Sequence, residues 1–349
     1  DAISVIMITV GMALTNFPNG IAAFPVIGAS LLDSFAGSFR NLYFVDGDMG
    51  SDGNDGLSPE SAKATVQAAV TAAAARNLYS QSGSIIYVKA KHMDAGATDP
   101  ESYAENIVIP AAGGANTVIV GVSANRTQCG LPQLKVGATT TSPLLTVRAP
   151  GCALINMGVN GYGGTGGGIL LDDDGSTKTA LGFSVLNSHL KNCVGTTATD
   201  CRTGGAIMWS ANGGAWQVRI AGNVFYKNVG DVVLKGTGVS VPQDVIIENN
   251  TFQGLATSVD CHLYLAGGSG MASVTVNNNV FADVLPALGS GSITRYVDMT
   301  GCTGIFSNNV VAGSYTTTGF GAAKAAAKIP TTVGIAGNYS DAGLIVREA

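Results

Sequence analysis

An eight-residue pattern returns at regular intervals through the second half of the chain. Its clearest copy is Val-Thr-Val-Asn-Asn-Asn-Val-Phe at 274–281, and the other copies begin at residues 183, 218, 245, 304 and 333. The sixth position of the copies is occupied by Ser188, Asn223, Asn250, Asn279, Asn309 and Asn338. A spacing of 27 to 35 residues is typical of a solenoid. Because apolar and polar residues alternate, the repeating unit is a strand, and the predicted fold is an all-β solenoid.

Stacking explains why the pattern repeats. Each copy has apolar side chains at positions one, three and eight, such as Val274, Val276 and Phe281, which one copy cannot bury alone. Coils stacked about 4.8 Å apart bury them together. The Asn at position six then lies over its counterpart in the next coil, where the amides can bond as a ladder. Asn also tolerates the left-handed backbone of a corner. The alternative interpretation is therefore that each Asn only forms a turn and makes no ladder.

Composition excludes several classes of function. The chain has 349 residues, of which only 12% are charged, and its net charge is −5 without a run of Lys or Arg, so a nucleic-acid partner is not expected. No Cys-x-x-Cys motif occurs and only three His are present, so we expect neither a metal site nor a cofactor. Cys193 and Cys201 could bridge, although buried free thiols are favoured. The low charge indicates a surface that other protein covers, or solenoid faces rich in Ser, Thr, Asn and Gly.

Residues 1–40 form a separate apolar arm. The first basic residue is Arg40, so a secretory signal is not indicated, and the sequence at 16–20 interrupts the run before it could span a membrane. We predict an extended arm that is buried against a partner or sister subunits, with a strand folded on its own solenoid as the alternative. The residues expected to bind are Ile3, Val5, Ile6, Ile8, Val10, Leu14, Phe17, Phe24 and Val26.

Residues 41–82 hold an initial strand at 42–45, a Gly/Asp-rich loop and a helix. Ser58 is a suitable N-cap, Pro59 suits the first helical position, and Asn77 is a plausible end. The apolar face of this helix comprises Val66, Ala69, Val70 and Ala73. We predict that it caps the open end of the core, with the solenoid occupying residues 83–349. Further strands are expected at 84–89, 106–109, 117–122, 134–136, 144–147, 153–157 and 343–347, and a helical or loop excursion at 322–329.

The loop and helix carry a resemblance. The run 44–59, with Gly-Ser-Asp-Gly-Asn-Asp-Gly-Leu-Ser-Pro, and Ala-Thr-Val-Gln-Ala-Ala-Val at 64–70 resemble the start of right-handed parallel β-helix proteins of bacteria and phages. The segment 12–20 is similar to the start of β-helix proteins found among phage head genes. The variable coil length also resembles that of pectate lyases and phage tailspikes. The resemblance implies a phage virion protein, either a capsid decoration (cement) protein or a tailspike-like one.

Candidates for chemistry are sparse. The Gly-rich run 163–168 lacks the ending of a phosphate loop, and the acidic run 172–174 is either a Ca²⁺ site or, more simply, a solvated turn. If the chain is an enzyme, Asp172, Asp173 and Asp200 are the candidate catalytic residues for cleaving a polysaccharide. A triad using His92, His189 or His262 stays open. Aromatic side chains that could stack on a sugar are Trp209, Trp216, Tyr226 and Tyr264.

In adjacent copies of the repeat the equivalents of Glu248 are Ala221 and Asn277, so no carboxylate is expected directly above or below it. The arm, the low charge, this absence of stacked carboxylates and the resemblance favour a structural protein. We expect a homotrimeric capsid decoration protein on the virion surface, held by its arm to the major capsid protein or another virion protein, with no membrane partner. The alternative functions are a tailspike-like protein that binds or depolymerises host polysaccharide, and a secreted bacterial lyase.

Overall fold

The structure is a computed structural model that describes twelve stretches between residues 41 and 340 and a short one after them. These are 41–80, 83–97, 99–123, 130–173, 180–195, 204–210, 215–234, 241–255, 262–266, 271–283, 297–313, 327–340 and 343–345. The predicted arm at 1–40 lies outside the described residues. No helix in the described part of the chain is long and apolar enough to cross a membrane.

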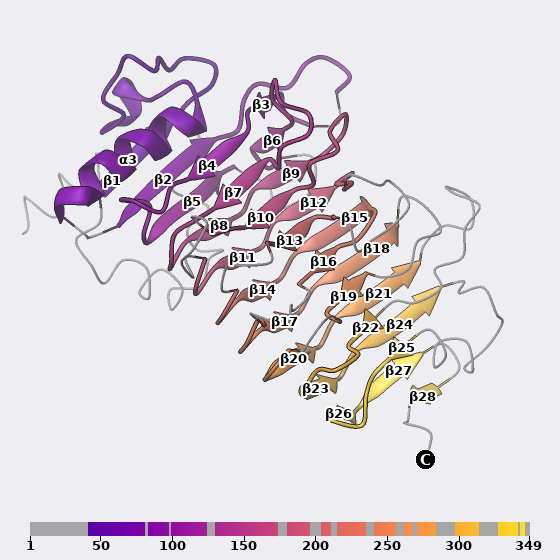
Figure 1. Ribbon diagram of the computed structural model, residues 1–349. Coiled ribbons are helices and arrows are strands. Elements are labelled where there is room, and N and C mark those ends of the chain that lie inside the picture. Colours follow the sequence, from indigo (N-terminus) through magenta and orange to yellow (C-terminus); the bar gives the residue numbers. More distant parts are fainter. Residues whose placement is uncertain are drawn as a thin grey trace, which may run out of the picture.

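Three parallel sheets wind around one core and form a stack of coils (Figure 1). Sheet A contains β1 Asn41–Val45, β2 Ser84–Lys89, β5 Thr117–Val122, β8 Ala153–Ile155, β11 Ser184–Leu186, β14 Arg219–Ala221, β17 Ile246–Glu248, β20 Val274–Asn277, β23 Gly304–Ser307 and β26 Val333–Ala336. Sheet B contains β3 Ser102–Ala104, β6 Gln133–Lys135, β9 Gly158–Asn160, β12 His189–Lys191, β15 Val224–Asn228, β18 Thr251–Leu255, β21 Val280–Asp283, β24 Val310–Gly313, β27 Asn338–Ser340 and β28 Gly343–Ile345. Sheet C contains β4 Ile107–Ile109, β7 Leu145–Val147, β10 Ile169–Leu171, β13 Ile207–Trp209, β16 Val232–Val233, β19 Leu263–Tyr264, β22 Val297–Asp298 and β25 Ala327–Lys328.

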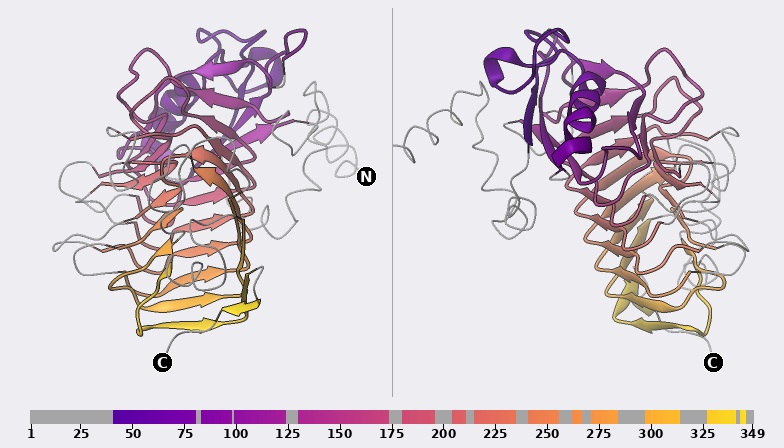
Figure 2. Two further views of the ribbon diagram at one scale, coloured as in Figure 1. Left: turned by 90° about the vertical axis from the view of Figure 1, so that its right-hand side faces the viewer. Right: turned by 60° about the vertical axis from the view of Figure 1, so that its left-hand side comes forward.

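The repeat is in register from coil to coil, as its spacing predicts. Position three is inward in sheet A, where Ile220, Ile247 and Val276 pair directly. Position eight is inward in sheet B, where the rings of Phe225 and Phe252 stack at 4.8 Å and those of Phe252 and Phe281 at 4.9 Å. All these side chains are fully buried, because each coil covers the next. Figure 2 shows the resulting stack from two further sides.

The predicted amide ladder at position six is confirmed. The backbone N–H and the Nδ2 of Asn223 both donate to Oδ1 of Asn250, at 2.9 and 3.0 Å. The same two bonds link Asn250 to Asn279, Asn279 to Asn309 and Asn309 to Asn338. Each Nδ2 also donates to a carbonyl of the preceding coil, as Asn250 does to Ile220 at 2.9 Å. The ladder therefore satisfies polar groups that are at most 1% exposed.

The left-handed corner falls one residue before the ladder, which corrects the assignment of both roles to position six. Position five carries Asn187, Asn249, Asn278 and Asn308 with φ between 49° and 56°, and in two other copies Gly222 and Gly337 with φ of 68° and 63°. Asn and Gly are the residues that accept this backbone at the lowest cost. Position five therefore turns the chain and position six forms the buried ladder between coils, while Nδ2 of Asn278 adds an exposed hydrogen bond to Asn249 at 2.6 Å.

The capping helix is confirmed, but its predicted bounds are wrong. Ser58 caps a short 3-10 helix, η2 Pro59–Ser61, and the α-helix α3 begins later and extends past Asn77 over Val66–Ser80. Two acceptors cap its first turn: Oγ1 of Thr65 accepts the N–H of Ala68 at 3.2 Å, and the distant carboxylate of Glu105 accepts the N–H groups of Val66 and Gln67 at 2.9 and 2.8 Å. The predicted apolar face is buried, and α3 packs on β1, β2 and β4 at the end of the stack (Figure 1).

The remaining predicted strands are found, with shifts of one or two residues at their ends. The strands at 84–89 and 117–122 have the predicted bounds. Two differences lie near the C-terminus. Residues 327–328, expected in an excursion, pair with β22 as strand β25 of sheet C. The closing strand β28 is antiparallel to β27, so it folds back on the last coil instead of continuing the winding.

Candidate functional site

The acidic run after β10 is tied to neighbouring coils. Asp172 accepts a hydrogen bond from Nε of Arg148 at 2.8 Å, and Asp173, which is 8% exposed, accepts one from Oγ of Ser210 at 3.1 Å. Arg148 and Ser210 directly follow β7 and β13, the strands on either side of β10. Asp174 and Asp200 lie outside the described residues. Both described carboxylates therefore have a partner on an adjacent coil, and Asp173 is buried where a solvated turn was predicted.

Carboxylates elsewhere on the coils are also paired. Glu248 lies between Ala221 and Asn277 in sheet A, as the repeat predicts, so neither direct neighbour is acidic. It accepts a hydrogen bond from Arg219 at 2.7 Å. Other ion pairs between coils join Asp46 to Lys89 and Asp99 to Lys191. Each of these carboxylates is paired with a basic side chain of another coil, whereas cleavage of a glycosidic bond uses two carboxylates that flank the bond.

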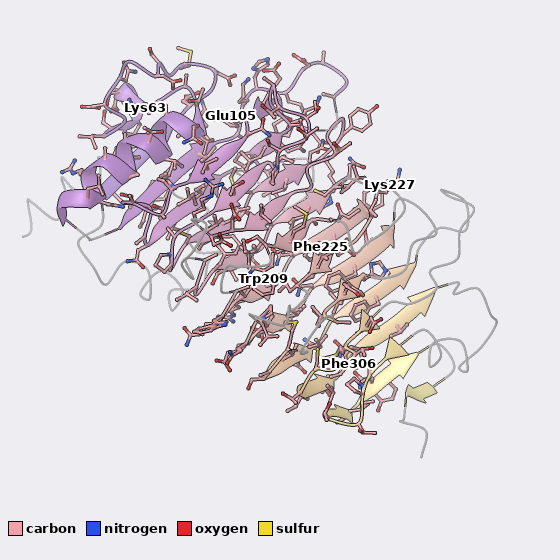
Figure 3. All side chains as sticks on the ribbon, in the orientation of Figure 1. Lys63, Glu105, Trp209, Phe225, Lys227 and Phe306 are labelled. Carbon is pink, nitrogen blue, oxygen red and sulfur yellow. The ribbon has the colours of Figure 1, made fainter. Side chains whose placement is uncertain are left out.

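The aromatic residues proposed for sugar stacking are not brought together on one sheet. Trp209 is a core residue of sheet C and 5% exposed, and Figure 3 labels it in the middle of the stack. Tyr226 belongs to sheet B, and Trp216, just before β14, donates its Nε1–H to the carbonyl of Val241 at 3.0 Å. Tyr264 lies in sheet C, two coils from Trp209 by strand order, and is only partly exposed. The four side chains do not form one platform.

His262 and Asp231 form a buried polar pair inside the solenoid. Nδ1 of His262 and Oδ2 of Asp231 are 2.5 Å apart, and Asn228 donates to the other carboxylate oxygen at 2.8 Å. Nε2 of His262 has no hydrogen-bond partner among the described residues. The imidazole lies near the stacked rings of Phe252 and Phe281. Because this pair is sealed in the core, it does not present a Ser-His-Asp triad to a substrate.

His189 and His92 have opposite environments. Burial, aided by the charge of Lys191, lowers the pKa of His189 to about 4. His92 is exposed at the N-terminal end of the solenoid, where its hydrogen bond to Asp48 raises its pKa. Burial alone would raise the pKa of Asp48, but the side-chain and backbone hydrogen bonds from His92 hold it below its ordinary value.

Asp48, His92 and Glu101 form a cluster that sequence reasoning missed. Their nearest ligand-type atoms all lie within 4.8 Å of one another. The three residues come from different segments, since 44 residues separate Asp48 from His92. No local spacing of His and carboxylates predicts such a group, and only the packing of the loop after β1 against the segment after β2 assembles it.

An uncharged stripe lies on the outside of sheet B. Position seven of the repeat pairs in register down the sheet, and its members from β15 to β27 are Val224, Thr251, Val280, Val310 and Tyr339. These five residues are called the position-seven stripe below. Val224, Val280, Val310 and Tyr339 are exposed, from 36% at Val224 to 54% at Tyr339, and Thr251 is half-buried. At one coil per step, the stripe is about 19 Å long.

The sheets and their register define the chain as a parallel β-solenoid. No protein-family model matches the sequence, and no curated protein matches it. Among solved structures, a GH136 lacto-N-biosidase from Eubacterium ramulus is similar over 86% of this chain and 67% of its own, with 10% identity and a TM-score of 0.37. The protein YbhC of Escherichia coli is similar over 86% of this chain and 85% of its own, with 11% identity and a TM-score of 0.39. At these identities, neither similarity says what this chain does.

Proposed function

We propose that the chain is a structural protein of a phage virion, a capsid decoration protein that is held by its apolar arm at 1–40. The observation that carries the proposal is the position-seven stripe, a row over five coils with no charged side chain, in which four members are exposed and Thr251 is half-buried. Long uncharged rows of this kind favour contact with protein over contact with water. The apolar sequence of the arm supports a second contact, with the major capsid protein or another virion protein.

The stripe supports self-assembly, and we propose a homotrimer as the assembled form. Its members repeat once per coil, so copies aligned side by side about a common axis present like rows to like rows. The strand spacing is the same in every copy, so such rows match over their whole length without a second complementary surface. A partner of different shape would lack this match.

Sedimentation of the full chain tests the assembly. We expect a trimer, and we expect Val280→Asp with Val310→Asp to give monomers, because two charges per copy would be buried without partners. The matched control is Thr71→Asp with Ala75→Asp, which adds the same charge on the exposed side of α3 and should leave the trimer intact. A monomeric native chain, or a trimer that survives the stripe variant, refutes this assembly.

Labelling of native particles tests the location. An antibody against the chain should decorate the capsid shell in electron micrographs, and a chain lacking residues 1–38 should keep its β-rich circular dichroism but fail to join the shell. Label confined to the tail, or a truncated chain that still assembles, contradicts the proposed role.

The alternative is a tailspike-like protein that binds or depolymerises host polysaccharide. The exposed ring of Tyr162, 69% accessible in the loop after β9, is the observation that favours it, since sugars stack on such faces. Release of reducing ends from host surface polysaccharide, abolished by Ala at Asp172, Asp173 or Asp200, would support this function and displace the structural one.

A further inference from the structure

Three segments converge at the N-terminal end of the solenoid and bring together an exposed imidazole and two carboxylates. Asp48 lies in the loop after β1, His92 lies after β2, and Glu101 precedes β3. Two main-chain N–H groups hold these segments together: that of His92 donates to the side-chain Oδ2 of Asp48 at 2.8 Å, and that of Glu101 donates to the carbonyl of His92 at 2.9 Å. The positions of His92 and Glu101 are therefore linked through the main chain, and the carboxylate of Asp48 is held by the main chain and the ring of His92.

The spacing of the side-chain atoms suits a metal ion. Nδ1 of His92 is 2.8 Å from Oδ1 of Asp48, and a carboxylate oxygen of Glu101 lies within 4.8 Å of both. Two ligand atoms bound to one zinc ion at about 2.1 Å are about 3.0–3.4 Å apart. An ion that replaces the proton shared by His92 and Asp48 therefore needs only a small opening of this pair and a modest approach of Glu101.

Neighbouring charges complete the arrangement. Nε2 of His92 is 3.5 Å from Oδ1 of Asp94, so a carboxylate lies beside the ring nitrogen that would face away from an ion at Nδ1. Metal-bound histidines commonly direct their second nitrogen to such a carboxylate, which orients the ring and strengthens the donor. Lys91 engages Oε2 of Glu101 at 2.7 Å, which leaves the other oxygen as the one offered to the ion.

We propose that Asp48, His92 and Glu101 bind a divalent transition-metal ion such as Zn²⁺ or Co²⁺. One imidazole nitrogen and two carboxylate oxygens suit these ions, whereas Ca²⁺ takes six or more oxygens. The remaining coordination positions face solvent, because all three residues are exposed. Bound there, the ion links the loop after β1 to the segments that contain His92 and Glu101, at the end of the stack that α3 caps. This site is independent of the proposed virion role.

Titration calorimetry of the full chain with ZnCl₂ tests the site, and the visible absorption of bound Co²⁺ reports whether nitrogen and oxygen ligands surround the ion. We expect one ion per chain, and at least a tenfold weaker affinity for Asp48→Asn and for His92→Gln. Asp244→Asn, which removes one exposed charge in a distant coil, is the matched control and should bind as the native chain does.

Each outcome decides the proposal. Ca²⁺ at an equal, millimolar concentration should leave the binding of Zn²⁺ unchanged. Unchanged circular dichroism of the variants shows that a loss of binding is not a loss of folding. Absence of binding to the native chain, equal binding by the two cluster variants, or displacement of Zn²⁺ by Ca²⁺ overturns it.

Discussion

The amide ladder should account for a large share of the stability of the central coils. Replacing Asn279 by Ala removes four hydrogen bonds, two donated by Asn250 to Oδ1 and two donated by Nδ2 to the carbonyl of Ile247 and to Asn309. The change leaves the backbone N–H of Asn250 and the carbonyl of Ile247 without these partners in a region that is about 1% exposed. A buried group left unpaired costs about 1–3 kcal/mol, so we expect the free energy of unfolding to fall by about 4 kcal/mol.

The neighbouring residue supplies the control. Asn278 is exposed and has φ of 54°, and Gly occupies the same position in two other copies of the repeat. Asn278→Gly keeps this backbone and removes one exposed hydrogen bond, from Nδ2 to Asn249, so it should change the free energy of unfolding by less than about 1 kcal/mol. Urea denaturation of both variants, followed by circular dichroism, gives the comparison, and hydrogen exchange at the amide of Asn250 reports the same loss locally. If Asn279→Ala costs no more than Asn278→Gly, the ladder is a consequence of stacking and does not stabilise it.

Three further predictions address the core, the cap and the pH dependence. Phe252→Ala opens a gap between two stacked rings and should lower the free energy of unfolding in urea by about 4 kcal/mol; a loss below 1 kcal/mol would contradict the stacking. Glu105→Ala removes the acceptor of two amides at the start of α3 and should cost about 2 kcal/mol, with faster hydrogen exchange in that helix than in the sheets; equal exchange in both would contradict the cap. The pKa of His189 is lowered to about 4 by burial and by Lys191, against the opposing charge of Asp99, whereas the unfolded imidazole titrates near 6.5. The contribution of neutral His189 to the free energy of unfolding is thus fully present above about pH 6.5 and is lost as the pH falls toward 4, by up to about 3 kcal/mol. His189→Gln should flatten this part of the curve of stability against pH, and an unchanged slope would contradict the assignment.

The repeat made most of the solenoid predictable. Register follows from a spacing near 29 residues together with alternation of apolar and polar side chains, because stacked coils must place like residues over like. Asn223, Asn250 and Asn279 could be aligned from their sequence positions alone, and the ladder follows from that alignment. The division of labour between positions five and six was not predictable, since adjacent Asn residues have the same propensities and only the path of the chain assigns the corner to the first.

Contacts between segments far apart in the chain were decided by the tertiary structure. The capping of α3 is an example: Ser58 and Pro59 form a valid local start signal but begin only the 3-10 helix, and the first two amides of α3 bond to Glu105, 39 residues beyond Val66. The cluster of Asp48, His92 and Glu101 arises in the same way, from loops that meet only when the first coils close. Sequence periodicity therefore determined which residues repeat and which face inward, because that depends on neighbours one coil away. Packing decided which distant carboxylate caps α3, which carboxylates become ion pairs and where an imidazole meets two acids, because those depend on three-dimensional distances that no local pattern contains.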